Sequence, residues 1–298
     1  MALAVCNTTV DQSGRELLEH GTTAFPIACY EDDFRIMDVP WHWHEEWEAV
    51  RITQGSCLVA AGNQKAMLRA GEGFFIHSGV LHGCWDTEGT GCRFHSLVFH
   101  PRLVGGNRDS VFHQQFVQPL LDHSALEIIL LKPDIPWQSQ ALEAIEAAWQ
   151  HCTKEENGFP FLVRHALSTL VFLLHTHHAP AVCSVRGRSS RNAERIKIML
   201  SWIHSHYDTE LSTTDIAACA SVSESECLRC FRATIGTTPI QYLKQYRIQQ
   251  AARLLAETGQ KVSDIAVSCG FQDMSYFTRA FREAMDCTPT QYRKNASL

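Results

Sequence analysis

The sequence has few of the features that mark secreted or membrane proteins. Its N-terminus lacks a basic segment followed by an apolar run, so we expect no secretory signal. The longest stretch without Lys, Arg, Asp or Glu covers residues 165–185, but its apolar part is only 166–174. Such a run is too short to cross a bilayer. We therefore expect a cytoplasmic protein without membrane contact.

The chain also lacks the positive charge that nucleic-acid-binding proteins usually carry, since its net charge is −6. The charge is unevenly distributed, however. Residues 1–185 contain 11 Lys and Arg against 21 Asp and Glu, whereas residues 193–298 contain 12 against 11. The short segment 186–192 adds three Arg. Positive charge is thus displaced toward the C-terminal part, which would have to bind DNA through the local placement of its arginines.

Disulfides are not expected, although twelve Cys are present. A cytoplasmic chain of 298 residues needs no covalent staples, so these side chains should be reduced thiols. Cys227 and Cys230 form a CxxC pair, but no second pair accompanies it, and a metal or redox role for it is not favoured. Hydrophobic residues make up 45% and charged residues 19%, which is typical of a globular protein, and the length favours two domains.

The pattern of short segments divides the chain into a β-rich and an α-rich part. Residues 25–100 alternate between short runs of β-branched or aromatic residues and Gly turns, which predicts a β-barrel or sandwich. Residues 108–178 have apolar residues at helical spacing. Residues 179–192 contain Pro, Gly, Ser and Arg without periodicity and are predicted to be a linker. We expect domains at 1–178 and 193–298, the second of them entirely helical.

The apolar stripes of the helices in 108–178 allow two interpretations. The stripe around residues 141–149 is explained by packing on the barrel. The stripe from Leu162 to Leu174 is wider, so this helix either packs on the barrel as well or pairs with its copy in a homodimer.

An internal repeat in the C-terminal part points to the function. The segment 231–244 parallels 281–294 at an offset of fifty, with Phe, Arg, Thr, Pro, Gln, Tyr and Lys recurring. Upstream, Asp215-Ile-Ala matches Asp264-Ile-Ala at an offset of forty-nine. Each half has helix-turn-helix form, and a helix over 239–257 joins the two. Two units so joined can place two helices in successive major-groove segments, roughly 34 Å apart.

Capping residues define the helices of each half. Thr213 or Thr214 is predicted to cap the first short helix, and Ser223 the next, with Glu226 completing a capping box. In the second half Ser263 is predicted to cap one helix, Gly270 lies in the turn, and a further helix runs from about Asp273 to Met285. Pro239 and Pro289 begin new helices.

At these residues the chain resembles the AraC/XylS family of transcription regulators. The resemblance covers about residues 193–294 and includes Ile265-Ala266-x3-Gly270-Phe271-x4-Tyr276-Phe277-x-Arg279-x-Phe281-Arg282-x6-Pro289-x2-Tyr292-Arg293. Asp286 stands where the family usually has Gly, and Asp tolerates the left-handed conformation. The resemblance implies a sequence-specific regulator without chemistry of its own.

The same resemblance implies that helices 223–233 and 273–284 contact DNA. The candidate contacts are Ser223, Ser225, Leu228, Arg229 and Arg232 in the first, and Asp273, Met274, Ser275, Thr278, Arg279 and Arg282 in the second. Arg229 or Arg279 would bind guanine in bidentate fashion, or else bind phosphate or a surface carboxylate. Glu224 and Glu226 would repel phosphate, although Glu can accept from cytosine.

Two motifs in the β-rich part resemble those of the cupin barrel. They are His42-x-His44-x3-Glu48-x6-Gly55 and Gly71-x5-His77-x-Gly79-x2-His82-x3-Asp86, the second with His77 and Asp86 in place of the usual Pro and Asn. The resemblance implies a jelly-roll-like barrel that senses a small effector. The residues matching the cupin metal ligands are His42, His44, Glu48 and His82, which suit a divalent transition metal or would hydrogen-bond an effector without a metal.

Strand parity places His42, His44 and Glu48 on one face and Trp41, Trp43 and Trp47 on the other. A tryptophan cluster that includes Trp85 suits stacking on a sugar, but packing under the helical layer explains it better. His77 and His95 are further candidate ligands.

Three functions are consistent with the sequence. The first is a DNA-binding regulator that responds to a small effector, such as a sugar or related metabolite, with double-stranded DNA, a second copy of the chain and RNA polymerase as partners. It needs no cofactor. The second is a cupin metalloenzyme that carries a DNA-binding tail. The third is a regulator that responds to metal or redox state through its His and Cys residues.

Overall fold

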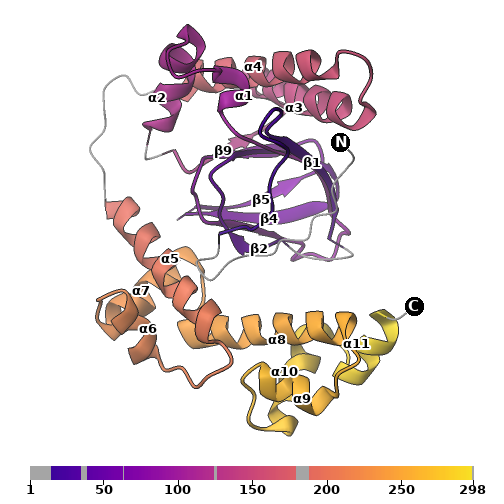
Figure 1. Cartoon of the computed structure of the whole chain (residues 1–298), viewed down its shortest axis with the longest axis vertical. Helices are drawn as coiled ribbons and strands as arrows, with labels where there is room; N and C mark the ends of the chain where they lie inside the picture. The colour runs from indigo at the N-terminus through magenta and orange to yellow at the C-terminus, as the bar shows by residue number, and fades with distance from the viewer. Residues whose placement is uncertain (1–14, 35–38, 63, 124–125, 179–187, 297–298) are drawn as a thin grey trace. The chain divides into compact units, whose positions relative to one another are not determined.

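The computed structural model describes residues 15–34, 39–62, 64–123, 126–178 and 188–296 (Figure 1). The chain divides into two compact units, with Gly14–Ala193 in the first and Glu194–Leu298 in the second. The first is a β-rich domain with a helical layer, and the second is entirely helical among its described residues.

Two antiparallel sheets form the barrel of the N-terminal unit, as the sequence predicted. The larger sheet has the strand order β1 (Ile27–Asp33), β8 (Arg93–Phe99), β3 (Trp47–Gln54), β6 (Gly73–Ile76) and β9 (Ile128–Leu131). The smaller has the order β2 (Val39–His42), β7 (His82–Trp85), β4 (Ser56–Ala61) and β5 (Gln64–Arg69). Strand β9 corrects the expectation of helix throughout 108–178. It pairs with β6, and a four-residue apolar run carries no periodicity by which to tell strand from helix.

Side chains of the larger sheet alternate between two apolar layers. On β3, Val50 and Ile52 point into the barrel, whereas Trp47 and Ala49 pack beneath the helices. On β8, Phe94 lies in the barrel layer and Leu97 beneath the helices. This period of two places Glu48, one residue before Ala49, inside the barrel with the apolar layer around it.

The helical layer covers the outer face of the larger sheet (Figure 1). It contains α3 (Pro136–Lys154) and α4 (Phe159–His178), together with α1 (Arg102–Gly105), a π-helical turn (His113–Val117) and α2 (Gln118–Leu121). By length and composition α4 is long and apolar enough to span a membrane, which the sequence reading did not foresee. Its inner side belongs to the same core cluster as α3 and the sheet, as in the core helix of a folded domain.

The C-terminal unit contains the two predicted helix-turn-helix units. Its helices are α5 (Arg188–His206), α6 (Thr213–Cys219), α7 (Glu224–Thr234), α8 (Pro239–Glu257), α9 (Val262–Ser268), α10 (Met274–Met285) and α11 (Pro289–Ala296). Helix α8 joins the two helix-turn-helix units, as expected. The predicted linker 179–192 is too long, because α5 already begins at Arg188; segment 188–192 has no Gly or Pro to prevent a helix, and 179–187 lies outside the described residues.

Two predicted helix caps and one predicted capping box need correction. Ser212, rather than Thr213 or Thr214, caps α6, since its hydroxyl and the Asp215 carboxylate bind each other's backbone N–H groups. Ser223 does cap α7, but Glu226 completes no capping box because its carboxylate binds arginines instead. Helix α9 begins after Lys261 without a side-chain cap, and Ser263 lies inside it.

Two backbone positions in the second helix-turn-helix unit have the left-handed conformation that the sequence predicted. Asp286 adopts a left-handed conformation with φ 53°, the conformation expected where the family has Gly. Gly270 has φ 78° in the turn between α9 and α10. A Cβ at Gly270 would lie 2.5 Å from the carbonyl oxygen of Tyr207, so both strain and a clash oppose any side chain there.

Gly270→Ala is therefore expected to lower the free energy of unfolding of the C-terminal unit by roughly 1–3 kcal/mol. Gly259→Ala is the matched control, because a Cβ at Gly259 meets nothing within 4 Å. Denaturant unfolding of both variants, followed by circular dichroism, measures the difference. Equal midpoints for the two variants would contradict this account of the turn.

Candidate functional site

An open hollow lies along α10 and is lined by most of the side chains predicted to contact DNA in the second helix-turn-helix unit. Its volume is about 730 Å³, and its lining includes Met274, Ser275, Thr278, Arg279, Arg282, Glu283 and Thr288. The opposite face of α10 is buried through Phe277, Ala280 and Phe281. This division of faces, expected from the sequence, leaves the outer side chains of α10 accessible to a large partner.

Two side chains at this surface differ in what they are free to bind. The Asp273 carboxylate accepts the backbone N–H of Tyr276 at 2.6 Å, so it serves as the cap of α10. The Arg279 guanidinium lies 5.8 Å from the centre of the Tyr276 ring. Among the described residues no carboxylate forms an ion pair with Arg279, which leaves its donors available to a ligand.

The outer face of α7 is different, because its arginine is already paired. Arg229 donates from Nε to Glu226 at 3.0 Å and from Nη2 at 2.5 Å. Glu226 also accepts from Arg195 of α5 at 3.0 Å. Ser225 and Arg232 are exposed and Leu228 is half-buried. The acidic side chain that the sequence marked as a source of phosphate repulsion thus neutralises much of the positive charge of α7.

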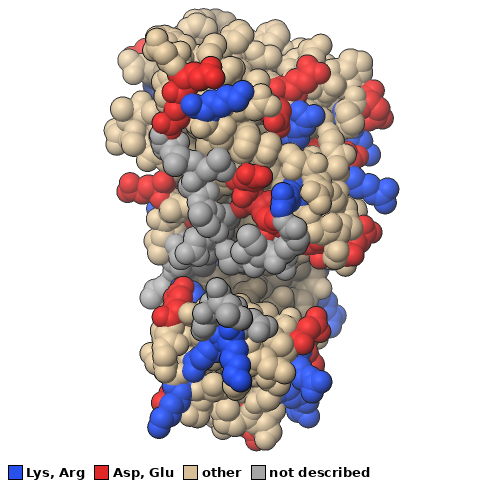
Figure 2. Space-filling model, turned by 90° about the vertical axis from the view of Figure 1, so that its right-hand side faces the viewer, with Lys and Arg blue, Asp and Glu red and all other residues tan. Residues whose placement is uncertain are grey.

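The surface charge of the molecule is mixed. Figure 2 shows one face, on which Lys and Arg side chains of the helical unit stand beside Asp and Glu side chains. Over the whole of residues 193–298, 12 Lys and Arg are nearly balanced by 11 Asp and Glu. Contact with a polyanion must therefore rest on individual side chains such as Arg279.

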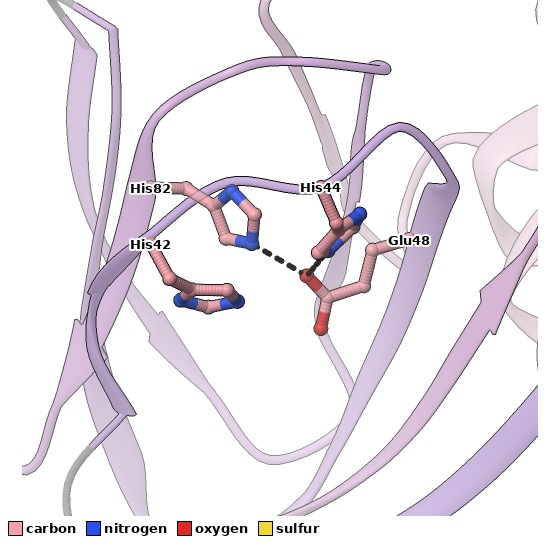
Figure 3. Close-up of side chains that lie close together, drawn as sticks. All are labelled: His42, His44, Glu48 and His82. Carbon is pink, nitrogen blue, oxygen red and sulfur yellow. Dashed lines mark ion pairs between the residues drawn. The ribbon is translucent and has the colours of Figure 1, made fainter. Parts of the chain in front are cut away.

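The second site lies inside the barrel, where four side chains from both sheets converge (Figure 3). His42 lies at the end of β2, His82 at the start of β7, Glu48 on β3, and His44 in the loop between β2 and β3. All four are buried, and one potential ligand atom from each lies within 4.8 Å of those of the others. The predicted cluster therefore exists. The parity argument for it is wrong at His44, because the chain leaves β2 after His42 and re-enters a strand only at Trp47.

Backbone carbonyls fix the orientation of all three imidazoles. His42 Nδ1 lies 2.9 Å from the carbonyl of Pro40, His44 Nδ1 3.1 Å from that of Glu46, and His82 Nδ1 2.8 Å from that of Val80. Because a carbonyl only accepts, each Nδ1 must carry the hydrogen. Each Nε2 then faces the shared space, the arrangement in which histidines of metal sites are held by their outer hydrogen bonds.

The inward-facing atoms are buried without matching hydrogen bonds. Glu48 Oε2 lies 2.9 Å from His82 Nε2 and 3.7 Å from His44 Nε2. Neither contact has hydrogen-bond geometry, so these three atoms lack a hydrogen-bond partner. The other carboxylate oxygen of Glu48 accepts the Ser96 hydroxyl at 3.0 Å. Both contacts are ion pairs when the imidazoles are protonated (Figure 3), and a cation in the same place would satisfy the three atoms without those protons.

Burial and mutual charge shift the pKa values of the cluster. Burial, helped by the neighbouring His82, lowers the pKa of His42 to about 3. Burial acts to raise the pKa of Glu48, but His44 and His82 outweigh it and hold that pKa well below its usual range. Burial likewise acts to lower the pKa of His82, yet the adjacent Glu48 carboxylate raises it overall. The Glu48 carboxylate is thus ionised, as metal binding requires, whereas the raised pKa of His82 favours its imidazolium form, so an ion would have to displace the His82 proton.

The cavity at this cluster is small. Its volume is about 30 Å³, whereas pockets for drug-sized ligands hold roughly 300–1,000 Å³. It is lined by His42, Glu48 and His82. Glu16, His20 and Tyr30, none of which was predicted from the sequence, line it as well. Glu16 and His20 precede the first strand and belong to no periodic pattern, so nothing in the sequence alone placed them at the barrel cavity.

The donor set fits a divalent transition metal. Three imidazole nitrogens and one carboxylate are typical ligands of such ions, at about 2.0–2.2 Å. Ligands around one ion lie roughly 3–4 Å apart, so the widest separation in the cluster, at most 4.8 Å, would have to shrink by roughly 1–2 Å to bring all four to an ion. Residues His42, His44, Glu48 and His82 would hold it, and the outer hydrogen bonds needed to orient them are already present.

Other side chains singled out by the sequence lie away from this cluster. His77 Nε2 lies 2.9 Å from the carbonyl of Leu120, and His95 stacks on Trp149. Trp47 packs beneath the helical layer as predicted, but Trp41 packs against Trp85 and Trp43 lies near Arg15. The tryptophans thus form no single surface for a sugar.

The described cysteines are free thiols, as expected. Burial raises the pKa of Cys227 to about 11 and also raises that of Cys230. A protonated thiol is a poor nucleophile and metal ligand, so the CxxC pair is not poised for redox or metal chemistry.

Comparison with known sequence families matches both units. The family described as "AraC-like ligand binding domain" matches residues 25–170, and the family described as "Helix-turn-helix domain" matches residues 216–295. The uncharacterized HTH-type transcriptional regulator YdeC of Bacillus subtilis is 30% identical over 298 residues, which cover 97% of this chain and 98% of that protein. The HTH-type transcriptional activator RhaS of Pectobacterium carotovorum is 26% identical and covers 86% of this chain and 88% of that protein.

Among solved structures, an AraC-type transcriptional regulator from Chromobacterium violaceum matches 35% of this chain and 93% of its own at 28% identity, with a TM-score of 0.34. The two family matches and the full-length relative together span both units described above.

Proposed function

Because the chain belongs to the AraC family of helix-turn-helix transcription regulators, we propose that a small effector bound inside its barrel controls how the two helix-turn-helix units bind DNA. The family pairs an effector-binding domain with a DNA-binding domain, and this chain has both. Coupling between them requires that the effector bind with different affinities to the DNA-competent and the incompetent arrangement of the protein.

Three imidazole Nε2 atoms and the Glu48 carboxylate converge inside the barrel. This convergence supports our placing the effector site there. His44 Nε2, His82 Nε2 and Glu48 Oε2 are buried without a hydrogen bond and are held together only as ion pairs, while backbone carbonyls orient the three histidines from outside. A divalent transition metal satisfies all four groups at once. We propose that such an ion, held by His42, His44, Glu48 and His82, is part of the effector site.

The size of the cavity favours a metal ion with its water over a sugar. About 30 Å³ accommodates an ion and roughly one or two water molecules. A sugar would require the barrel to open, and the tryptophans that suit sugar stacking lie elsewhere. A metal-responsive regulator is therefore the form of the hypothesis that the geometry supports best.

Metal analysis of the chain, purified without chelators or affinity tags that bind metals, tests the proposal. One equivalent of a transition metal per chain is the expected result. A protein that stays metal-free in the presence of each of Mn²⁺, Fe²⁺, Co²⁺, Ni²⁺ and Zn²⁺, with DNA binding intact, would eliminate both this site and the metalloenzyme alternative, which needs the same ligands.

We propose that α10 contacts the DNA bases, whereas α7 mainly contacts the DNA phosphate backbone and so positions the protein. Arg279 has no carboxylate partner in the part of the chain that the structure describes, and it lies in the hollow with Met274, Ser275 and Thr278, whereas Arg229 is bound by Glu226. Ser223 and Asp273 cap their helices, so we assign them the role of fixing the start of each helix at the proposed contact surface. Ser225, Leu228, Arg232 and Arg282 complete the proposed contact surface.

Glu226→Gln is expected to strengthen binding to DNA of any sequence. The change removes a negative charge and releases Arg229 and Arg195, so each additional phosphate contact should steepen the salt dependence by about 0.9 in the slope of log K against log salt. Fluorescence anisotropy with a random duplex at several salt concentrations measures both effects.

Glu224→Gln is the control for this prediction. It removes the same charge from the same helix, but Glu224 accepts from the Thr214 hydroxyl and binds no arginine in the described part of the chain. Its slope should change less. Identical slopes for the two variants would show that Glu226 does not restrain Arg229.

We also propose that the chain forms a homodimer through the outer face of α4. Phe161 is 80% exposed and Phe172 54% exposed, and together with Phe112 and Phe116 they line an apolar groove. Exposed aromatic patches of this kind mark protein interfaces. Sedimentation equilibrium tests this, and a monomer at every concentration would contradict it. The dimer would act in the cytoplasm on double-stranded DNA and contact RNA polymerase there.

A further inference from the structure

Glu16 brings a second carboxylate to the barrel cavity from outside the motif that supplies the other four groups. Its side chain is 5% exposed, and Oε2 lies 4.0 Å from His42 Nε2. The cavity of about 30 Å³ lies between Glu16, His42, Glu48 and His82. A backbone hydrogen bond of 2.9 Å from Glu16 N–H to the carbonyl of Trp43 holds the segment in place.

A chain of hydrogen bonds orients this carboxylate. His20 Nε2 lies 3.0 Å from Glu16 Oε2, and His20 Nδ1 lies 2.8 Å from the Tyr30 hydroxyl. A carboxylate accepts, so the Nε2–H of His20 donates to Glu16, and Nδ1 on the other side of the ring pairs with the Tyr30 hydroxyl. The His20 ring also packs edge-on against His44, with ring centres 5.4 Å apart. Such an outer set of bonds is typical of a group that serves a metal centre.

If the proposed metal site is taken as the premise, we infer that Glu16 binds the water molecule that completes the coordination of the ion. Glu16 Oε2 lies 4.0 Å from His42 Nε2 but does not belong to the group of atoms that all lie within 4.8 Å of one another, so we place it outside the direct ligands. The small cavity lies between Glu16 and the cluster, and its volume of about 30 Å³ leaves room for a water molecule beside the ion. An anchored water ligand favours ions with five or six ligands, whereas three imidazoles and Glu48 alone complete the tetrahedron that Zn²⁺ prefers.

Titration of the full-length protein with Co²⁺ tests this inference, because the intensity of the visible cobalt bands distinguishes four-coordinate from five- or six-coordinate ions. The wild-type protein should show the weak bands of high coordination. Glu16→Ala should show the intense bands of four-coordination and bind Co²⁺ about 10–100-fold more weakly, the usual effect of losing an outer partner. Zn²⁺ affinity, measured by chelator competition, should change less.

Two further variants keep the test decisive. Glu16→Gln preserves shape and can still accept from a water, so it should fold normally and lie between wild type and Glu16→Ala. Glu19→Gln, an exposed change in the same segment, should have no effect. A Glu16→Ala protein with wild-type bands and affinity would overturn the role of Glu16 while leaving the metal site standing. Failure of the wild-type protein to bind Co²⁺ would overturn both.

Discussion

Glu48→Gln should weaken transition-metal binding more than about 100-fold. Loss of an outer partner typically costs 10–100-fold, and Glu48 is the one anionic group among the four proposed ligands. The amide is nearly the same size as the carboxylate and can still accept the Ser96 hydroxyl, so the barrel should remain folded. Chelator competition with Co²⁺ or Zn²⁺ measures the affinity.

Glu45→Gln is the matched control for this prediction, because Glu45 lies in the same segment and is exposed. Its affinity should equal that of the wild type. If Glu48→Gln bound the metal as tightly as Glu45→Gln, the ion would have to lie elsewhere, and the convergence of the four side chains would need another explanation.

Arg279→Ala should weaken binding to a selected DNA site by about 5–150-fold, the equivalent of 1–3 kcal/mol for one bidentate contact with guanine. The structure supports this because Arg279 has no carboxylate partner among the described residues and lies in the hollow of α10. The affinity for the selected duplex and for the same duplex with each base pair changed in turn gives both the loss and the position that is read.

The pattern of the loss distinguishes base reading from phosphate contact. If Arg279 reads a base, its removal relaxes specificity at one position. If it binds phosphate, every sequence loses affinity alike and the salt slope falls by about one. Arg253→Ala is the control, since this arginine lies near Glu257 on α8 and is expected to be neutral toward DNA. A loss that is uniform across sequences would contradict the assignment of α10 as the reading helix.

The DNA-binding half was predictable from the sequence because its information is local. Helix caps, turns and apolar spacing are determined within a few residues. Because the C-terminal part is an internal repeat, each of these signals occurs in both halves. Pro239 and Pro289 begin helices, and Asp286 takes the left-handed conformation expected at its position. Errors arose where several capping residues stood side by side. Ser212 rather than Thr213 caps α6, because only Ser212 is followed three residues later by an acidic residue, Asp215, that completes a capping box.

The barrel site was predictable in its membership but not in its geometry. Motif spacing gave His42, His44, Glu48 and His82, yet the strand on which the parity argument relied is interrupted by a loop. Glu16 and His20 were missed because only long-range pairing brings their segment beside Trp43. The ion pair between Glu226 and Arg229 fits helical spacing, but whether an exposed pair forms depends on neighbours such as Arg195, which the sequence does not place.

We propose that an ion bound in the barrel controls DNA binding, and one measurement tests this directly. A duplex selected by the full-length protein from a random pool would be titrated with metal-stripped protein and with protein reloaded to one equivalent. We predict that Kd changes by about 5–150-fold, as expected for coupling of 1–3 kcal/mol between two sites. An unchanged Kd while the metal content rises from zero to one per chain would contradict the account.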